Sequence, residues 1–385
     1  MAVRGMFAAV AAMALVIGAP AQAQVKVGAI LSLTGPAASL GIPERNTLDI
    51  LPKTIGGEPL ALTILDDASE PANAVRAARK LVDEEKVDFI IGPTITQTSL
   101  AILEVVAQAK TPIISLAGSS VIVTPPEGNK AWAFMLAPAE TSMGHYIFRH
   151  MAKNGKKTVA FIGFSDAFGD SFLGEMRKLA EKNNVKVLTD ERYARTDTSV
   201  TAQVLKAVST NPDAIIIGAS GTPGVAPILE LRKVNYRGDI YANQGMANVD
   251  VLRVGGAQLT GVRLPVSPVL VAEQLPETNP TKAAGVEYLK AYEGKYGPNS
   301  RTLFGATAWD AFLIADKAVG RAKSMARPGT VEFRTALRDA IKETKDFVGA
   351  QGVFTMSDKD HNGTDLRAQV LVEIKDGKWT YVPVD

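Results

Sequence analysis

Four hydroxyl side chains lie between an apolar run and a helical pattern in residues 90–106, IIGPTITQTSLAILEVV. They are Thr94, Thr96, Thr98 and Ser99. Hydroxyls at such a junction are typical of a phosphate-binding loop, a nucleophile, a helix cap or a cradle for another ligand. A phosphate-binding loop needs a lysine that this stretch lacks, and a nucleophile needs a base, whereas the chain has only three scattered histidines. A helix cap, expected at Thr98 or a neighbour, and a ligand cradle remain.

Loops rich in Gly, Ser, Thr or amide side chains follow six of the predicted strands. They cover residues 32–41, 92–99, 115–120, 163–171, 218–224 and 243–248. In open α/β sheets, ligands bind beyond the carboxyl ends of the strands. Free N–H groups at helix starts and hydroxyl donors attract an anionic group such as a carboxylate, although turns and caps are the better explanation for any single loop. Six loops, three in each half of the chain, favour a cleft site.

Signs of catalysis or of a bound metal are weak. Residues 163–167, GFSDA, come closest to the G-x-S-x-G pattern but end in Ala. His145 and His150 are five apart in a predicted helix, so they do not share a face as metal ligands would. Residues 358–369, DKDHNGTDLRAQ, match the first half of a calcium loop, but Gln369 stands where the bidentate carboxylate belongs, and an Asn-Gly turn is favoured. We therefore expect no enzyme, no metal and no cofactor.

Two further groups do not fit known catalytic or cofactor sites. The glycines of residues 218–224, GASGTPG, lack the G-x-G-x-x-G spacing and the ribose-binding acid of a dinucleotide site. Asp66 and Asp67 are neighbours at the end of a predicted strand, and neighbouring side chains of an extended chain point opposite ways. This geometry is poor for a catalytic pair, and we expect the two residues to cap the next helix.

Short apolar runs recur along the chain, with helical patterns between them. Most runs are continuously apolar, which is typical of strands buried on both faces of a parallel sheet. One series lies in residues 25–115 and a second in residues 158–241, with Pro-rich segments after each. This alternation predicts an α/β fold of two doubly wound lobes. Helices are expected near 74–82, 167–182, 224–235, 280–295, 303–322 and 330–343, and final strands near 352–356 and 369–384, with a hairpin turn at 375–378.

Composition limits the class of protein. The 385 residues exceed the usual size of one core and favour two domains. A net charge of +2 without a basic cluster argues against nucleic acid as a partner. The absence of cysteine excludes disulfides, thiolate metal sites and a lipid-anchored N-terminal Cys. Residues 1–23 combine Arg4, an apolar run too short to span a bilayer and an A-x-A site at Ala21 and Ala23, which predicts a cleaved signal peptide and export.

Five segments, in this order, resemble the periplasmic substrate-binding proteins of ABC importers, in the branched-chain amino acid (Leu/Ile/Val) binding family. They are VKVGAILSLTGPAASLG, DDASEPANAVRAARKLVDEEKVDFIIGP, TPIISLAGSS, SDAFGDSF and WDAFLIADKAV. The resemblance spans essentially the whole mature chain. It implies a type I periplasmic binding fold, in which two α/β lobes joined by three hinge crossings close on a small ligand. Lobe 1 is then expected in 24–139 and 268–352, and lobe 2 in 140–267 and 353–385. The expected partner is a membrane permease, and the chain is expected to be a monomer.

The resemblance also implies roles for individual residues. In this family a hydroxyl after the IIGP segment holds the ligand carboxylate, and the matching residue is Thr96. A second carboxylate hydroxyl matches Ser119, and a carbonyl that accepts from a ligand amino group matches that of Ala117. The aromatic residue of the second lobe's "YG" motif matches Phe168, and an apolar wall residue matches Phe304.

This chain departs from the family pattern at two places. The acid that neutralises the ligand ammonium matches Gln244, whose amide cannot neutralise a buried ammonium but can bond a keto, hydroxyl or amide oxygen. Where aromatic hydroxyls line the family's cleft, this chain has Leu40 and the small residues Ser220, Gly221 and Thr222. Both departures predict a carboxylate ligand with an apolar or aromatic body: an aromatic acid, or a branched or aromatic 2-keto acid. The alternatives are a branched-chain amino acid binder, an exported α/β hydrolase and a sensor domain.

Overall fold

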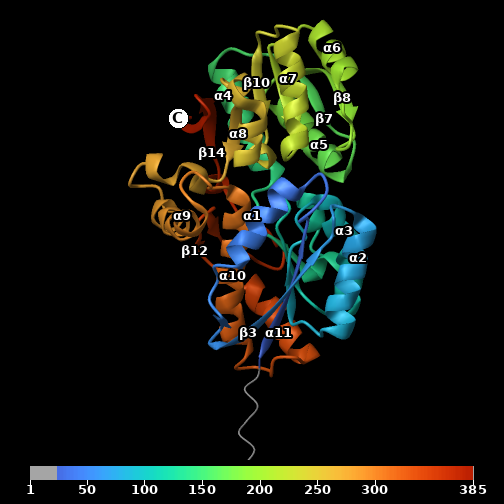
Figure 1. Cartoon of the computed structure of the whole chain (residues 1–385), viewed down its shortest axis with the longest axis vertical. Coiled ribbons are helices and arrows are strands. Elements are labelled where there is room, and N and C mark those ends of the chain that lie inside the picture. The colour runs from blue at the N-terminus through green and yellow to red at the C-terminus, as the bar shows by residue number, and fades with distance from the viewer. Residues whose placement is uncertain (1–23, 385) are drawn as a thin grey trace, which may run out of the picture.

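The computed structural model describes residues 24–384 and shows two α/β lobes that follow each other along the long axis of the molecule (Figure 1). The predicted signal peptide, residues 1–23, lies outside the described residues. The first lobe is built on a six-stranded sheet with the order β2-β3-β1-β4-β5-β6. Its strands are β1 (Val25–Leu31), β2 (Thr54–Ile55), β3 (Glu58–Asp66), β4 (Phe89–Ile91), β5 (Ile113–Ser115) and β6 (Ala133–Met135). Neighbouring strands are parallel except for the β2–β3 hairpin.

Helices cover both faces of this sheet, because alternate residues of a strand point to opposite sides. The helices of the first lobe are α1 (Ala38–Leu48), α2 (Pro71–Arg79), α3 (Thr96–Gln108), α10 (Leu303–Ala322) and α11 (Val331–Lys342). Alternate residues of β1 from Val25 to Leu31 share a core with α10 and α11, whereas Ile30 shares a core with α2 and α3. Burial on both faces explains why the strand sequences are continuously apolar.

The second lobe contains a seven-stranded sheet with the order β15-β14-β11-β10-β9-β7-β8. Its strands are β7 (Thr158–Phe164), β8 (Lys186–Tyr193), β9 (Ala214–Gly218), β10 (Asp239–Ala242), β11 (Arg263–Val266), β14 (Val370–Lys375) and β15 (Lys378–Val382). Its helices are α4 (Glu140–Lys153), α5 (Ala167–Lys182), α6 (Thr201–Ser209), α7 (Val225–Lys233) and α8 (Val249–Gly255). The five strands from β7 to β11 are parallel, and β14 and β15 form the predicted antiparallel hairpin.

The chain passes between the two sheets three times: after β6, after β11, and between β13 (Val353–Phe354) and β14. Helix α9 (Lys282–Tyr296) and the short strand β12 (Phe347–Val348) belong to the segment between the last two crossings. The hydroxyl of Ser267 donates to Gln351 Oε1 at 2.9 Å, so the start of the second crossing is bonded to the segment just before β13. The two-lobed architecture with three crossings is therefore confirmed, whereas the exact lobe boundaries stay a prediction.

The segment that resembles a calcium loop, residues 358–369, belongs to the third crossing. Asp358 is exposed and pairs with Lys342 at 2.6 Å. Asp360 accepts two backbone N–H groups of its own turn, at 2.9 Å each. The amide of Asn362 donates to two backbone carbonyls at and just after β6, at 2.8 and 2.9 Å. The side chains of this segment are therefore used to fix the crossing to the first lobe.

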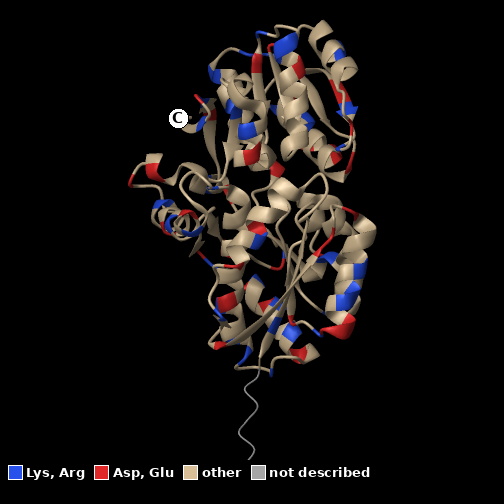
Figure 2. Cartoon of the chain, viewed as in Figure 1, with Lys and Arg blue, Asp and Glu red and all other residues tan. Residues whose placement is uncertain are grey.

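Charged residues of both signs are spread over both lobes, with no region of a single sign in this view (Figure 2). This distribution agrees with the net charge of +2. Within residues 24–384, no helix combines the length and the apolar character needed to cross a membrane.

Candidate ligand-binding site

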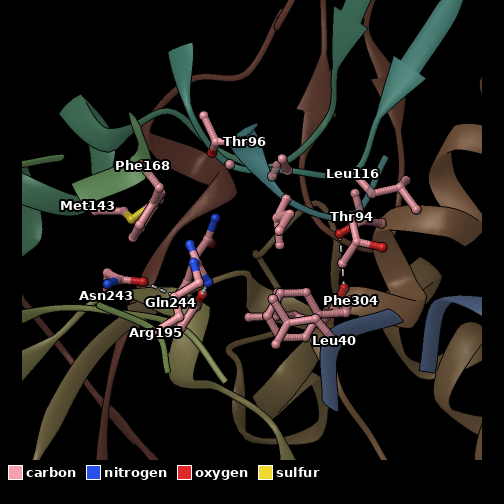
Figure 3. A pocket seen from close by; sticks show the side chains of 18 residues that line it. Leu40, Thr94, Thr96, Leu116, Met143, Phe168, Arg195, Asn243, Gln244 and Phe304 are labelled. Atoms are coloured by element: carbon pink, nitrogen blue, oxygen red, sulfur yellow. Dashed lines mark hydrogen bonds between the residues drawn. The ribbon is translucent and has the colours of Figure 1, made fainter. Parts of the chain in front are cut away.

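A cavity lies between the lobes, where loops from the carboxyl ends of both sheets meet (Figure 3). Each of the six loops predicted from the sequence contributes at least one side chain to it. The lining residues are Leu40, Thr94, Ile95, Thr96, Leu116, Ala117, Gly118, Ala137, Met143, Phe168, Arg195, Ser220, Asn243, Gln244, Gly245, Leu303, Phe304 and Thr307. The empty space is about 470 Å³, with the mouth included, which suits a small molecule and not a macromolecule.

The four hydroxyls at the start of α3 have different surroundings. Thr94 donates to the carboxyl group of Glu44 at 2.5 Å. Thr98 donates to the backbone carbonyl three residues before it at 3.1 Å, and Ser99 lies 2.9 Å from another buried serine hydroxyl. The hydroxyl of Thr96 has no hydrogen-bond partner within residues 24–384, and Thr96 lines the cavity (Figure 3). Of the four, only Thr96 combines a place at the cavity with a hydroxyl that is free to bind a ligand.

Both capping predictions are wrong. The residue before α3 is Ile95, and no side chain caps this helix, because Thr98 bonds a carbonyl instead. The first-turn N–H groups of α3 therefore lack a side-chain acceptor at the cavity wall. Helix α2 also begins without a side-chain cap. Asp66 accepts backbone N–H groups from the loop after β1, and Asp67 accepts the hydroxyl of Ser32 at 2.7 Å, so these carboxylates tie two loops together.

Ser119 is not among the lining residues, although Ala117, two positions before it, is. The Ser119 hydroxyl donates to Glu140 Oε1 at 2.8 Å, and the backbone N–H of Ser120 donates to Oε2 at 3.0 Å. Ser171, from α5 of the second lobe, donates to the same carboxylate at 2.6 Å. Glu140 thus joins a loop of the first lobe to a helix of the second, and the Ser119 hydroxyl is already occupied.

An acidic side chain lies behind the cavity wall and not on it. Glu44, in α1, is fully buried, and one of its oxygens has no partner. Burial raises the pKa of Glu44 well above its usual value; the hydrogen bond from Thr94 opposes this shift, and the nearby carboxyl group of Asp67 adds to it. Glu44 therefore does not provide an exposed anion for a ligand.

Arg195 lines the second-lobe side of the cavity and was not predicted from the sequence. It follows β8, and its side chain is only 8% exposed. Nε donates to Asp166 Oδ2 at 2.6 Å, and Nη1 donates to Ser220 Oγ at 2.8 Å. The guanidinium carbon lies 4.1 Å from the ring centroid of Phe164, a stacking contact that holds the plane of the group. The arginine is therefore fixed in place at the cavity.

Gln244 presents an N–H group to the cavity. It begins the 3₁₀ turn Gln244–Met246 after β10. Its Oε1 accepts from Gln369 Nε2 at 2.8 Å, which leaves Nε2 on the cavity side. This nitrogen would be 3.3 Å from a Cβ on Gly118 of the first lobe, so the two lobes meet here. The neighbouring Asn243 is fully used inside its own lobe, because its amide donates to the carbonyl of Ala219 and accepts from Gly245 N–H.

The remaining walls are apolar. Leu40 and Phe304 lie together on the first-lobe side, and Phe168 and Met143 lie on the second-lobe side (Figure 3). Phe168 stacks on a second phenylalanine ring of α5 at 5.9 Å. Of the ten residues predicted for the site, Ser119, Gly221 and Thr222 do not line the cavity, and the other seven do.

The family model described as "Periplasmic binding protein" matches residues 24–378, which is most of the chain. The chain belongs to the periplasmic binding protein family. Members bind small-molecule ligands and deliver them to ABC permeases, and the family is one of solute-binding proteins and not of enzymes. Membership places this periplasmic binding protein among proteins of the periplasm.

Named relatives of this periplasmic binding protein agree with the predicted family. Leu/Ile/Val-binding protein homolog 3 of Brucella melitensis is 22% identical over 345 residues, which cover 88% of each chain. The crystal structure of an extracellular ligand-binding receptor from Rhodopseudomonas palustris is 40% identical with a TM-score of 0.90, covering 94% of this chain and 100% of the other. An ABC transporter solute-binding protein from R. palustris, in complex with benzoate, is 22% identical with a TM-score of 0.80, covering 93% and 95%. The predicted fold and family are thus confirmed.

Proposed function

We propose that this protein captures a small carboxylic acid with an apolar or aromatic body and delivers it to an ABC permease. The observation that carries this proposal is the cavity lining, which contains an arginine and an amide N–H donor but no Asp or Glu among its 18 residues. A ligand ammonium would lose its water there without gaining a counter-charge, which is costly. A carboxylate would find donors.

The proposed binding begins on the first lobe. The hydroxyl of Thr96 and the first-turn N–H groups of α3 hold the carboxylate, since the start of a helix favours an anion. The apolar body then packs against Leu40, Phe304 and Phe168, at about 25 cal/mol per Å² of buried apolar surface. The closed arrangement is selected because only there does the ligand contact both lobes. The occupied hydroxyl of Ser119 positions Glu140 instead of touching the ligand.

Two classes of carboxylate compete for this site. The names of the Brucella relatives favour Leu, Ile or Val. The benzoate complex of the R. palustris solute-binding protein provides an example of this fold with an aromatic acid. The absence of an acid from the cavity lining favours aromatic acids and 2-keto acids over amino acids. We also propose that the chain acts as a monomer, without catalysis, after removal of residues 1–23.

Thr96→Val is expected to weaken binding of the acid about 10- to 100-fold, because a hydrogen bond to a charged group contributes about 1.5–3 kcal/mol. A thermal-shift screen with benzoate, phenylpyruvate, 4-methyl-2-oxopentanoate and leucine first identifies the acid, and calorimetry then measures its affinity. Thr98→Val is the matched control, since the Thr98 hydroxyl already donates to the backbone carbonyl three residues before it and Thr98 does not line the cavity. A larger shift with leucine than with every acid would contradict the proposed ligand class, and unchanged affinity of Thr96→Val would contradict the proposed role of Thr96.

Gln244→Glu tests the polarity of the second-lobe wall. The side-chain carboxylate introduced by this substitution can still accept from Gln369. It replaces the N–H group that faces the cavity with a negative oxygen. We expect affinity for the acid to fall tenfold or more at pH 8, about 1.4 kcal/mol or more, because like charges repel in a desolvated site. Gln244→Met, which removes the amide without adding charge, is the control and should lose less. If Gln244→Glu binds the acid as tightly as Gln244→Met does, the ligand has no anionic or acceptor group near residue 244.

A further inference from the structure

Three side chains that carry free hydrogen-bond donors share one side of the cavity. In the view of Figure 3, Thr96, Arg195 and Gln244 lie on one half of the cavity, and we call this half the donor side. Leu40 and Phe304 lie on the other half. Both lobes build the donor side, because Thr96 begins α3 of the first lobe, whereas Arg195 and Gln244 follow β8 and β10 of the second.

The two lobes approach each other at the donor side. Gln244 Nε2 would be 3.3 Å from a Cβ on Gly118 of the first lobe. Helix α3, which Thr96 begins, is in contact with α5 of the second lobe. Asp166, the residue directly before α5, accepts from Arg195 Nε at 2.6 Å. The arginine is therefore tied to the helix that packs against α3, so donors of both lobes can meet one small group of a ligand.

Thr96, Arg195 and Gln244 each keep a donor that no protein group accepts within residues 24–384. Asp166 accepts from Nε of Arg195 and Ser220 accepts from Nη1, which leaves Nη2 without a partner. Only Oε1 of Gln244 is bonded, so its Nε2 has no partner either, and the same is true of the Thr96 hydroxyl. An ionised carboxylate only accepts hydrogen bonds, and it is the group that all three donors can bind.

Arg195 is the only charged side chain among the 18 residues that line the cavity. It is 8% exposed, and its stacking contact with Phe164 holds the plane of the guanidinium. Its partner Asp166 lies outside the lining and also accepts the N–H of Gly169 at 3.0 Å, so the start of α5 meets part of that negative charge. A hydrogen bond in which both groups are ionised is stronger than a neutral one. Arg195 can therefore distinguish a carboxylate from an uncharged group of the same shape.

We infer that both lobes bind the same ligand carboxylate, Thr96 and the start of α3 on the first lobe and Arg195 and Gln244 on the second. This inference rests on the proposed carboxylate site at Thr96. Arg195 is then the specificity-determining residue of the second lobe, because its charge favours an anion over an uncharged group. Closure of the lobes also depends on the charge of the ligand, since the second lobe makes its strongest contact with the carboxylate. Amides and esters with the same apolar body should bind weakly.

Acids and their primary amides test this inference by calorimetry, since the amide keeps the shape of the carboxylate but not its charge. The pairs are benzoate and benzamide, phenylacetate and phenylacetamide, and phenylpyruvate and 4-methyl-2-oxopentanoate with their own primary amides. We expect the wild-type protein to bind the tightest acid about 100-fold more tightly than its amide. In Arg195→Met, the acid should lose about 10- to 100-fold in affinity and the amide less than about threefold. Thr96→Val, in the other lobe, should also weaken the acid more than the amide.

Two further variants complete the test. Arg192→Met removes an arginine three residues away, which bonds the carbonyl of Phe164 and Asp170 and does not line the cavity, so it should keep the preference for the acid. Arg195→Lys keeps the charge but not the planar fork, so it should weaken the acid about tenfold, and it takes the place of Arg195→Met if that variant does not fold.

The failed outcomes separate the inference from the proposal on which it rests. Equal weakening of acid and amide in the Arg195 variants, or unchanged binding of the acid, overturns the inference but leaves the carboxylate site at Thr96 intact. Failure of the wild-type protein to prefer any acid to its amide instead overturns the proposed function.

Discussion

At pH 4, Asp310→Ala is expected to lower the free energy of unfolding by about 2–5 kcal/mol, because it leaves two buried backbone N–H groups without an acceptor. Asp310 lies in α10 and is completely buried. Its Oδ1 accepts from Ala350 N–H at 2.8 Å and its Oδ2 accepts from Gln351 N–H at 2.9 Å. Gln351 in turn accepts from Ser267, so this single carboxyl group fixes the segment that joins two of the three crossings.

The contribution of Asp310 to the free energy of unfolding should also depend on pH. Burial raises the pKa of Asp310 to about 7 in the folded protein, from an ordinary value of 3.8, against the opposing effect of the two N–H groups. The folded chain therefore keeps a proton that the unfolded chain releases between pH 4 and pH 7. Stability from this group is fully present below pH 4 and is lost as the pH rises through 7, by on the order of 4 kcal/mol.

Two variants isolate these effects in urea or thermal unfolding measured from pH 4 to pH 8. Asp310→Asn keeps one acceptor but cannot titrate, so the stability difference between it and the wild-type protein should shrink as the pH rises. Asp316→Ala, in the same helix, removes one bond to a half-buried backbone N–H of Gly56 and should cost no more than about 1.5 kcal/mol. A wild-type minus Asn difference that stays constant over this range contradicts the pH argument. A loss in Asp310→Ala at pH 4 that is no larger than the loss in Asp316→Ala contradicts the structural argument.

The sequence predicted most of the fold because buried parallel strands are recognisable one at a time. Strands such as β4 and β9 are apolar at every position, since they are covered on both faces. Strand β8 escaped recognition because it is an edge strand whose sequence, KVLTDERY, mixes charged and apolar residues. An edge strand has one free side and one partly solvated face, so it needs no continuous apolar run.

The missed strand also explains the missed arginine. Arg195 follows β8, and the rule that ligands bind beyond the carboxyl ends of strands would have pointed to it once β8 was recognised. Ser119 does not line the cavity for a different reason. Its sequence context matches a ligand-binding loop, but Glu140 takes its hydroxyl, and a pairing between residues 21 positions apart on either side of a crossing has no local signal. Thr96 was predicted and lines the cavity, because the start of a helix after a buried strand is a local feature.

Gly221→Ala is expected to weaken ligand binding about tenfold, about 1.4 kcal/mol, because it places a methyl group between the lobes and displaces side-chain ends of the first lobe. Gly221 belongs to the loop after β9 in the second lobe, and its backbone has φ +63° and ψ −165°, a conformation that is essentially restricted to glycine. A Cβ at this position would lie 2.8 Å from Leu40 Cδ1 and 2.9 Å from Ser39 Oγ, both in α1 of the first lobe. The methyl group would therefore meet the first lobe when the lobes close.

The substitution also strains the second lobe itself, and Gly256→Ala separates the two effects. Gly256 lies in the same lobe with a similar backbone, φ +51° and ψ −140°, but nothing lies within 4 Å of its Cβ position. Both variants should lose about 1–3 kcal/mol of stability from backbone strain. Only Gly221→Ala should also lose affinity for the tightest acid of the ligand screen, and small-angle scattering should show that it stays extended when that acid is added. If Gly256→Ala loses as much affinity as Gly221→Ala, strain alone accounts for the loss, and the contact between Gly221 and Leu40 does not control closure.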